Sequence, residues 1–140
     1  MDKAAIIADA GDNELMRFLG VEIVEVSAEK VVLSMEVTPK MHQYVGIMHG
    51  GVSMYLAETA ASIGAVSNAD LAKVTPVGVE INGNHLRAVS KGTLTVTSRP
   101  VFTGRTMAVW QTEIVSDKGK LVCTSRCTFS LQNRPAIGSA

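Results

Sequence analysis

A single carboxylate stands in a long run of apolar and small residues in the middle of the chain. Glu58 is the only charged side chain within residues 50–69. Burying a carboxylate among apolar side chains costs several kcal/mol unless it is paired or protonated. An acid kept in such a place is a candidate general base or nucleophile. The structural alternative is an acid on an exposed stripe, or one paired with an arginine.

Two sets of polar groups could act with Glu58. One lies one helical turn after it, and the other precedes the run of apolar and small residues. Ser62 shares the helix face of Glu58, where its hydroxyl could hold a water beside the carboxylate. Upstream, His49 precedes a glycine pair, Gly50 and Gly51, at the start of the run. The free amides and dipole of a helix N-terminus favour a developing oxyanion, and glycines let a substrate carbonyl approach. The pattern predicts an electrophile-binding end and a carboxylate two to three turns apart on one helix.

Other catalytic arrangements lack their motifs. No Gly-x-Ser-x-Gly elbow is present, so a serine triad is not supported. The three histidines, His42, His49 and His85, have neither zinc-ligand spacing nor an acidic cluster beside them, so we expect no metal. A lone histidine such as His49 can also be purely structural.

The elements that position these residues form an α+β pattern. Residues 51–69 carry apolar side chains at helical spacing and small residues elsewhere, which is typical of a buried central helix. The stretch to Gly20 predicts a short helix with Asn13 or Asp12 as its cap. Strands are expected at residues 21–26, 31–37, 74–87, 92–101, 106–115 and 121–131. Tight turns between them favour antiparallel pairing, which gives a curved antiparallel sheet around one long helix.

Composition limits the remaining possibilities. The 140 residues carry 13 basic and 13 acidic side chains, and 46% are hydrophobic. This predicts one domain, 1–140, with an N-terminal helical segment 1–20 and a flexible tail 132–140. A neutral chain argues against binding to nucleic acid or to a membrane. We expect a cytoplasmic protein, because no signal peptide is apparent and Cys123 and Cys127 lie about 13 Å apart on a strand, too far for a disulfide.

The motif residues resemble those of a known family. The segment Gln43-Tyr-Val-Gly-Ile-Met-His49-Gly50-Gly51, followed by Glu58 and Ser62, is similar to the signature of hotdog-fold acyl-CoA thioesterases. The most similar branch includes the phenylacetate-pathway, 1,4-dihydroxy-2-naphthoyl-CoA and 4-hydroxybenzoyl-CoA thioesterases. The likeness spans residues 19–131 and includes Gly78-Val-Glu-Ile-Asn82-Gly-Asn-His85-Leu-Arg87.

The resemblance implies a hotdog fold and a catalytic role for each motif residue. Glu58 would be the nucleophile or the general base, two possibilities that the sequence leaves open. The Gln43 side chain, His49 and the amide of Gly51 or its neighbour would hold the thioester carbonyl, and Ser62 would assist the water or the acyl group. Two subunits would pair edge to edge, so that each active site uses both chains. We expect at least a homodimer, and a homotetramer built from two dimers.

Substrate-binding residues follow from the same resemblance. The acyl pocket would involve Tyr55, Thr59 and residues 42–48, with Phe18 and Leu19 near its mouth. The cations Arg87, Lys91, Arg99 and Arg105 are expected to gather near the CoA phosphates, although ordinary surface charge is the alternative. The residues expected to bind substrate or CoA are Gly50, Tyr55, Thr59, Gly78, His85, Leu86, Arg87, Ala88, Phe102, Thr103, Gly104, Arg105, Thr106 and Met107.

The predicted function is hydrolysis of an acyl-CoA thioester with a small aromatic or medium-chain acyl group. No cofactor is expected, because coenzyme A is part of the substrate. Two alternatives stay open. An acyl-CoA dehydratase or hydratase would use a histidine and a helix carboxylate. A non-catalytic acyl-CoA sensor would be expected to lack Glu58 or to carry a DNA-binding extension.

Overall fold

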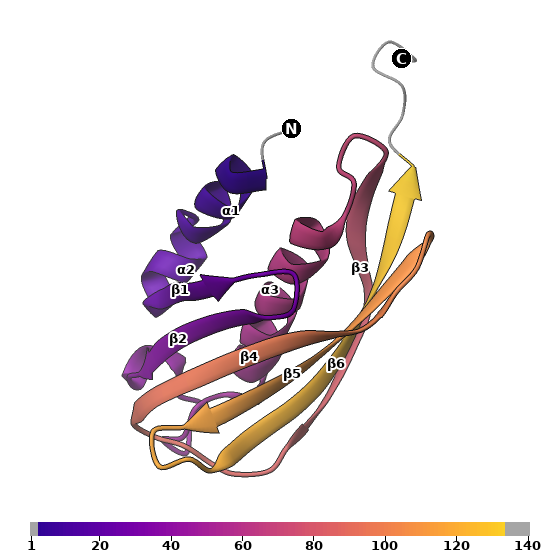
Figure 1. The fold of residues 1–140 in the computed structure, drawn as a ribbon. Helices are drawn as coiled ribbons and strands as arrows, with labels where there is room; N and C mark the ends of the chain where they lie inside the picture. The colour runs from indigo at the N-terminus through magenta and orange to yellow at the C-terminus, as the bar shows by residue number, and fades with distance from the viewer. Residues whose placement is uncertain (1–2, 134–140) are drawn as a thin grey trace.

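Six strands within residues 3–133 form one antiparallel sheet (Figure 1). A computed structural model describes these residues, so most of the expected tail, 132–140, lies outside the described part. The strand order is β1-β2-β4-β5-β6-β3. The strands are β1 (Val21–Val26), β2 (Val31–Val37), β3 (Val74–His85), β4 (Gly92–Thr103), β5 (Met107–Ser116) and β6 (Leu121–Asn133). The expected strands and the expected α+β class are confirmed.

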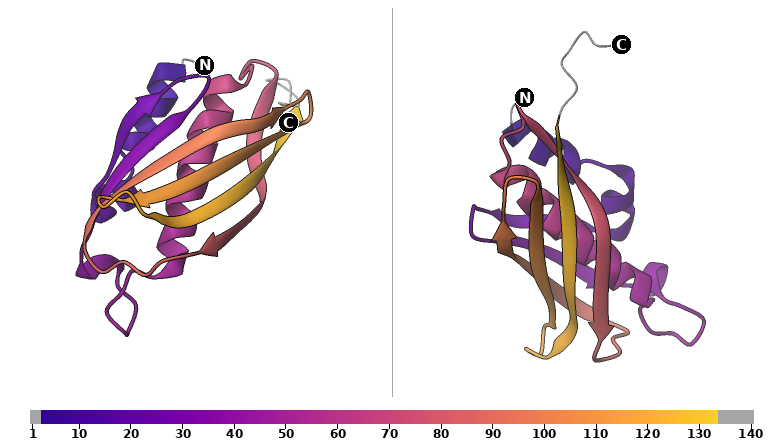
Figure 2. Two further views of the ribbon diagram at one scale, coloured as in Figure 1. Left: turned by 60° about the horizontal axis from the view of Figure 1, so that its bottom comes forward. Right: turned by 90° about the vertical axis from the view of Figure 1, so that its right-hand side faces the viewer.

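The long helix α3 (Gly50–Asn68) lies in the concave face of this sheet (Figures 1 and 2). Most of its buried residues are small, and Ala60 and Ala61 are fully buried. Small side chains let the helix axis approach the sheet closely enough for Trp110 of β5 to fill the space beside it. An ideal Cβ on Gly64 would overlap the Trp110 ring, so the helix backbone packs directly against the ring at this glycine.

The N-terminal segment contains two helices where the sequence predicts one. Helix α1 (Lys3–Gly11) ends before Asn13, and α2 (Glu14–Leu19) begins after it. The Asn13 side chain accepts a hydrogen bond from the Met16 amide, so Asn13 rather than Asp12 is the cap. Gly20 ends α2 with a φ of 68°, as expected. A short 3-10 turn, η1 (Pro39–Met41), follows β2.

Strand β3 lies at one edge of the sheet and pairs with the last strand, β6. The tight-turn pattern did not predict this order, because the link from β3 to β4 is not a hairpin. The other edge of β3 is unpaired among the described residues. Val77 and Val79 are 39% and 58% exposed along this strand. An open edge with exposed apolar side chains is a surface that pairs readily with another strand.

No helix within residues 3–133 is long and apolar enough to cross a membrane. The chain's two cysteines are both free and buried under the sheet, as their spacing predicted. Burial raises the pKa of the Cys127 thiol to about 12, and the charges of Glu58 and Glu80 add smaller effects of the same sign. This thiol therefore stays protonated at neutral pH.

The Cys127 thiol should make the protein less stable in alkali. Its folded pKa lies above the ordinary value of 9.0, so its contribution is intact below pH 9 and is lost progressively from pH 9 to 12. The loss should reach about 1.4 kcal/mol at pH 10. Urea unfolding at pH 8 and pH 10 measures it, and Cys127→Ala should lose less over the same interval. Equal losses in both proteins would contradict this assignment.

Candidate active site

A cleft of about 330 Å³ opens at the N-terminus of α3. The loop before the helix and the segment that follows β3 form its walls. The Cα atom of Gly50 faces the His85 ring, since an ideal Cβ on Gly50 would lie 2.8 Å from His85 Nε2. Any side chain at position 50 would therefore displace His85. The lining residues are Gln43, Ile47, Met48, Gly50, Ser53, His85, Leu86, Arg87, Ala88, Val89 and Val122.

Local hydrogen bonds orient the two polar side chains that precede α3. His49 caps the helix, and its Nδ1 accepts a hydrogen bond of 2.8 Å from the Gly51 amide. A neutral imidazole with Nδ1 as acceptor carries its proton on Nε2, so the exposed ring edge is a donor. Gln43 Oε1 accepts from the Val45 amide at 2.6 Å, which leaves its Nε2 group as a donor. The resemblance implies that Gln43, His49 and the Gly51 amide hold the thioester carbonyl, and in this structure the Gly51 amide already donates to His49.

Glu58 lies in a second hollow, of about 400 Å³, further along α3. Its Oε1 packs against Gly78 of β3, where an ideal Cβ would be only 2.9 Å away. Ser62 lines the same hollow one turn later, as its spacing predicted. The remaining lining residues are Ala10, Asn13, Leu15, Tyr55, Thr59 and Ile63.

Glu58 is exposed, although its apolar surroundings in the sequence suggested burial. No salt bridge within residues 3–133 involves it. The difference arises because the Glu58 side of α3 faces the open edge of the sheet, where the chain provides no further strand to cover it. In the isolated chain Glu58 therefore lies on an exposed stripe of the helix, which was the structural alternative in the sequence analysis.

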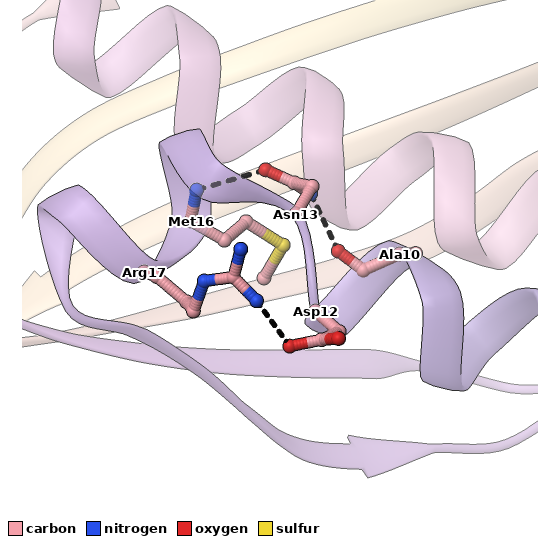
Figure 3. A network of polar contacts seen from close by, with 5 residues as sticks. All are labelled: Ala10, Asp12, Asn13, Met16 and Arg17. Atoms are coloured by element: carbon pink, nitrogen blue, oxygen red, sulfur yellow. Dashed lines mark hydrogen bonds and ion pairs between the residues drawn. The ribbon is translucent and has the colours of Figure 1, made fainter.

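The corner between α1 and α2, whose polar contacts are drawn in Figure 3, contributes Ala10, Asn13 and Leu15 to the wall of the Glu58 hollow. Asn13 Nδ2 donates to the Ala10 carbonyl at 2.6 Å while its Oδ1 caps α2. An ion pair joins Arg17 of α2 to Asp12 in the link between the two helices. Leu15 is 50% exposed beside the hollow. Sequence reasoning missed these wall residues, because a helical pattern does not show where two short helices dock.

The expected mouth residues Phe18 and Leu19 lie elsewhere. They line a different hollow beside β1 and β2, together with Arg17 and Lys40. Leu19 is 8% exposed, and the Phe18 ring lies 5.0 Å from Lys40 Nζ. Leu15, rather than either of them, lines the Glu58 hollow.

Tyr55 contributes a neutral hydroxyl to the Glu58 hollow. Burial raises the pKa of Tyr55 above its ordinary 10.0, and a hydrogen bond with Thr59 acts in the opposite direction. The phenol is therefore a hydrogen-bonding group at neutral pH, next to Thr59 and Ser62.

The two parts of the predicted site do not meet within one chain. Glu58 follows Gly51 by seven residues, which is about 10 Å along a helix axis. Gln43 and Gly50 line the cleft, whereas Glu58 lines the other hollow. A general base must lie within hydrogen-bond reach of the group it serves, directly or through one water.

The residues expected to bind CoA are separated in the same way. His85 pairs with Cys123, at one end of β6, whereas Met107 pairs with Ser130, about 23 Å along that strand. The β4–β5 hairpin that contains Phe102, Thr103, Gly104, Arg105, Thr106 and Met107 thus lies at the opposite end of the sheet from the loop before α3 (Figure 2, left).

The cations expected to gather near CoA also separate, because the sheet holds them apart. Arg87 and Lys91 line one hollow together, whereas Arg99 lines another beside Gln111 and Glu113. Arg105 belongs to the β4–β5 hairpin. Within residues 3–133, no three His, Cys, Asp or Glu side chains come together where they could hold a metal ion.

Comparisons with known proteins identify the family. Residues 45–123 match the family model described as Thioesterase superfamily. A 1,4-dihydroxy-2-naphthoyl-CoA hydrolase from Listeria monocytogenes is 42% identical over 86% of this chain and 97% of its own. The proofreading thioesterase EntH of Cronobacter turicensis is 36% identical over 84% of this chain and 85% of its own.

A solved structure extends the agreement to the fold. A thioesterase from Haemophilus influenzae superposes with a TM-score of 0.84 at 37% identity, and the match covers 91% of this chain and 88% of that chain. Six antiparallel strands within residues 3–133 around one central helix are the hotdog fold. The resemblance noted in the sequence is confirmed, and the chain belongs to the thioesterase superfamily.

Proposed function

We propose that the protein hydrolyses an acyl-CoA thioester to the free acid and CoA. The observation that carries this proposal is the arrangement along α3. Two hydrogen-bond donors stand at its N-terminus, Gln43 Nε2 in the cleft and His49 Nε2 at the helix cap, and an exposed carboxylate, Glu58, stands in a hollow further along. Donors aimed at a carbonyl and a free carboxylate are the two groups that hydrolysis of a thioester needs.

The complete site would form between two copies of the chain. If the open edge of β3 pairs antiparallel with its copy about a two-fold axis, the His85 end of one strand lies beside the Gly78 end of the other. Glu58 packs against Gly78, and Gly50 packs against His85. Pairing therefore carries the partner's Glu58 toward the cleft of the first chain. The exposed Val77 and Val79 support this assembly, while its doubling to a tetramer stays a prediction.

In such a dimer the thioester carbonyl would accept hydrogen bonds from Gln43 and His49. The partner's Glu58 would take a proton from a water molecule, whose oxygen attacks the carbonyl carbon, and the C–S bond then breaks as CoA leaves. In the other possible course, the carboxylate attacks the carbonyl carbon directly, the C–S bond breaks as CoA leaves, and water opens the resulting mixed anhydride. Both courses give the same products and require the same three side chains.

The Glu58 hollow would receive the acyl group. Its walls combine apolar Leu15 and Ile63 with the hydroxyls of Tyr55 and Thr59. Such walls suit a small aromatic acyl group that carries a hydroxyl, which is also the kind of acyl group in the name of the Listeria relative. Medium-chain acyl groups are the second class to test.

Hydrolysis of a panel of acyl-CoAs tests the proposal. Aromatic thioesters, with and without ring hydroxyls, are compared with straight-chain thioesters of similar size, and released CoA is measured with a thiol reagent. We expect turnover of at least one substrate, with higher kcat/KM for hydroxylated aromatic acyl groups. Because Cys123 and Cys127 are buried, the enzyme's own thiols should give little background. Tight binding of CoA without hydrolysis of any substrate would favour a sensor instead.

A further inference from the structure

A basic hollow of about 270 Å³ lies where the segment after β3 meets the β5–β6 hairpin. We propose that this hollow, and in particular Lys118 and Lys120 of the hairpin, binds the phosphate groups of CoA; this rests on the proposed function. The hollow is lined by Arg87, Ala88, Val89, Ser90, Lys91, Ser116, Asp117, Lys118, Lys120 and Val122.

The charges around the hollow favour an anion. Arg87, Lys91, Lys118 and Lys120 face it, and Asp117 is the one carboxylate among the described residues that line it. The Asp117 carboxylate is turned against Gly92, where an ideal Cβ would lie 2.5 Å from its Oδ2. No salt bridge within residues 3–133 involves any of the four cations. A neutral chain therefore gathers unpaired positive charge at this place, which suits a ligand with several phosphates.

Arg87 is held in position for such a ligand. Its Nη1 donates to the Leu121 carbonyl at 2.8 Å, and the amides of Leu86 and Arg87 both donate to the Val122 carbonyl. The rest of the guanidinium remains available for phosphate oxygens. Because the side chain is already ordered, less conformational entropy is lost on binding.

The basic hollow shares a wall with the cleft at the N-terminus of α3. Arg87, Ala88, Val89 and Val122 line both. The shared segment is tied to the loop before α3, because the Met48 amide donates to the Val89 carbonyl at 2.8 Å. His42 Nε2 lies 2.8 Å from the Ser90 carbonyl oxygen and strengthens this link. One ligand could therefore place its thioester at Gln43 and His49 and its phosphates at the lysines.

The test compares two thioesters of the same acyl group, one on CoA and one on pantetheine, which lacks the nucleotide and its phosphates. The double variant Lys118→Ala/Lys120→Ala should lower kcat/KM for acyl-CoA about tenfold, mainly through KM, and leave kcat/KM for acyl-pantetheine unchanged. Added salt should reduce the difference between the two enzymes. The matched control is Lys73→Ala, an exposed lysine beyond the other end of α3, which should behave as wild type.

A binding experiment separates this inference from the proposed function. Calorimetric titration with adenosine 3′,5′-bisphosphate should show binding to the wild type and about tenfold weaker binding to the double variant. If no thioester is hydrolysed but this difference is found, the phosphate site holds and the proposed function fails. If acyl-CoA is hydrolysed with unchanged KM by the double variant, the phosphate site is wrong and the function stands. An effect confined to an acyl group on an acidic carrier protein would also overturn the inference.

Discussion

Replacing Glu58 by glutamine should lower kcat for acyl-CoA hydrolysis by roughly 10²–10⁴-fold, the range expected for loss of a general base. A glutamine keeps the shape of the side chain but neither accepts a proton nor attacks a carbonyl. Because Glu58 is exposed and forms no salt bridge within residues 3–133, the variant should fold as the wild type does. Thiol release measures the rate, and circular dichroism checks the fold.

The matched control is Glu113→Gln, an exposed carboxylate that lines a hollow on β4 and β5 away from α3. It should retain full activity. A Glu58→Gln enzyme with the wild-type rate would show that another group activates the nucleophile.

The proposal that the site forms between two chains gives the same variant a second, sharper consequence. Gln43→Ala should also be inactive, because it removes a donor to the thioester carbonyl. In a mixed dimer of Glu58→Gln and Gln43→Ala chains, one of the two sites keeps both wild-type residues. Random pairing makes half of the dimers mixed, so the mixture should recover about one quarter of the wild-type activity. No recovery from co-expressed chains, with mixed dimers demonstrated by two affinity tags, would place both residues of each site on one chain.

Replacing Gly64 by alanine should destabilise the protein by about 1–3 kcal/mol, the usual cost of overpacking a core. The added methyl would overlap the six-membered ring of Trp110, which is fully buried beneath α3. The gain in helix propensity, about 1 kcal/mol, offsets only part of this cost. Urea unfolding of the two proteins gives the difference in free energy.

Gly11→Ala, at the last residue of α1, is the control for adding a methyl group to a helical glycine that no aromatic ring covers. Its methyl would meet only the flexible end of Ile23, at 3.3 Å, so stability should change by less than about 0.5 kcal/mol. A second comparison makes Gly64→Ala in a protein that also carries Trp110→Phe. Phenylalanine lacks the ring atoms that a methyl group at position 64 would touch. There the cost of Gly64→Ala should fall by at least about 0.5 kcal/mol. An equal loss of stability in both backgrounds would contradict the close packing of Gly64 against the Trp110 ring.

Much of the fold could be predicted because its signals are local. The apolar and small residues of 51–69, the alternation in Val31–Val37 and the cap at Asn13 each depend on neighbours a few residues away. The pairing of β3 with β6 depends on contacts between residues far apart in the chain. Local patterns carry no information on which of several similar strands will be neighbours.

For the candidate site, too, the local features could be predicted and the tertiary contacts could not. The sequence by itself determined the residue types and their spacing: Glu58 and Ser62 on one helix face, His49 and Gln43 before it. Only the tertiary structure decided that Glu58 is exposed against Gly78, that Gly50 faces His85, and that these contacts lie apart at the open edge of β3. The reason is physical. The spacing of residues along a helix fixes the direction in which each side chain points and its height along the axis. Whether a side chain such as Glu58 is buried depends on which strand of the sheet has no neighbour to cover it.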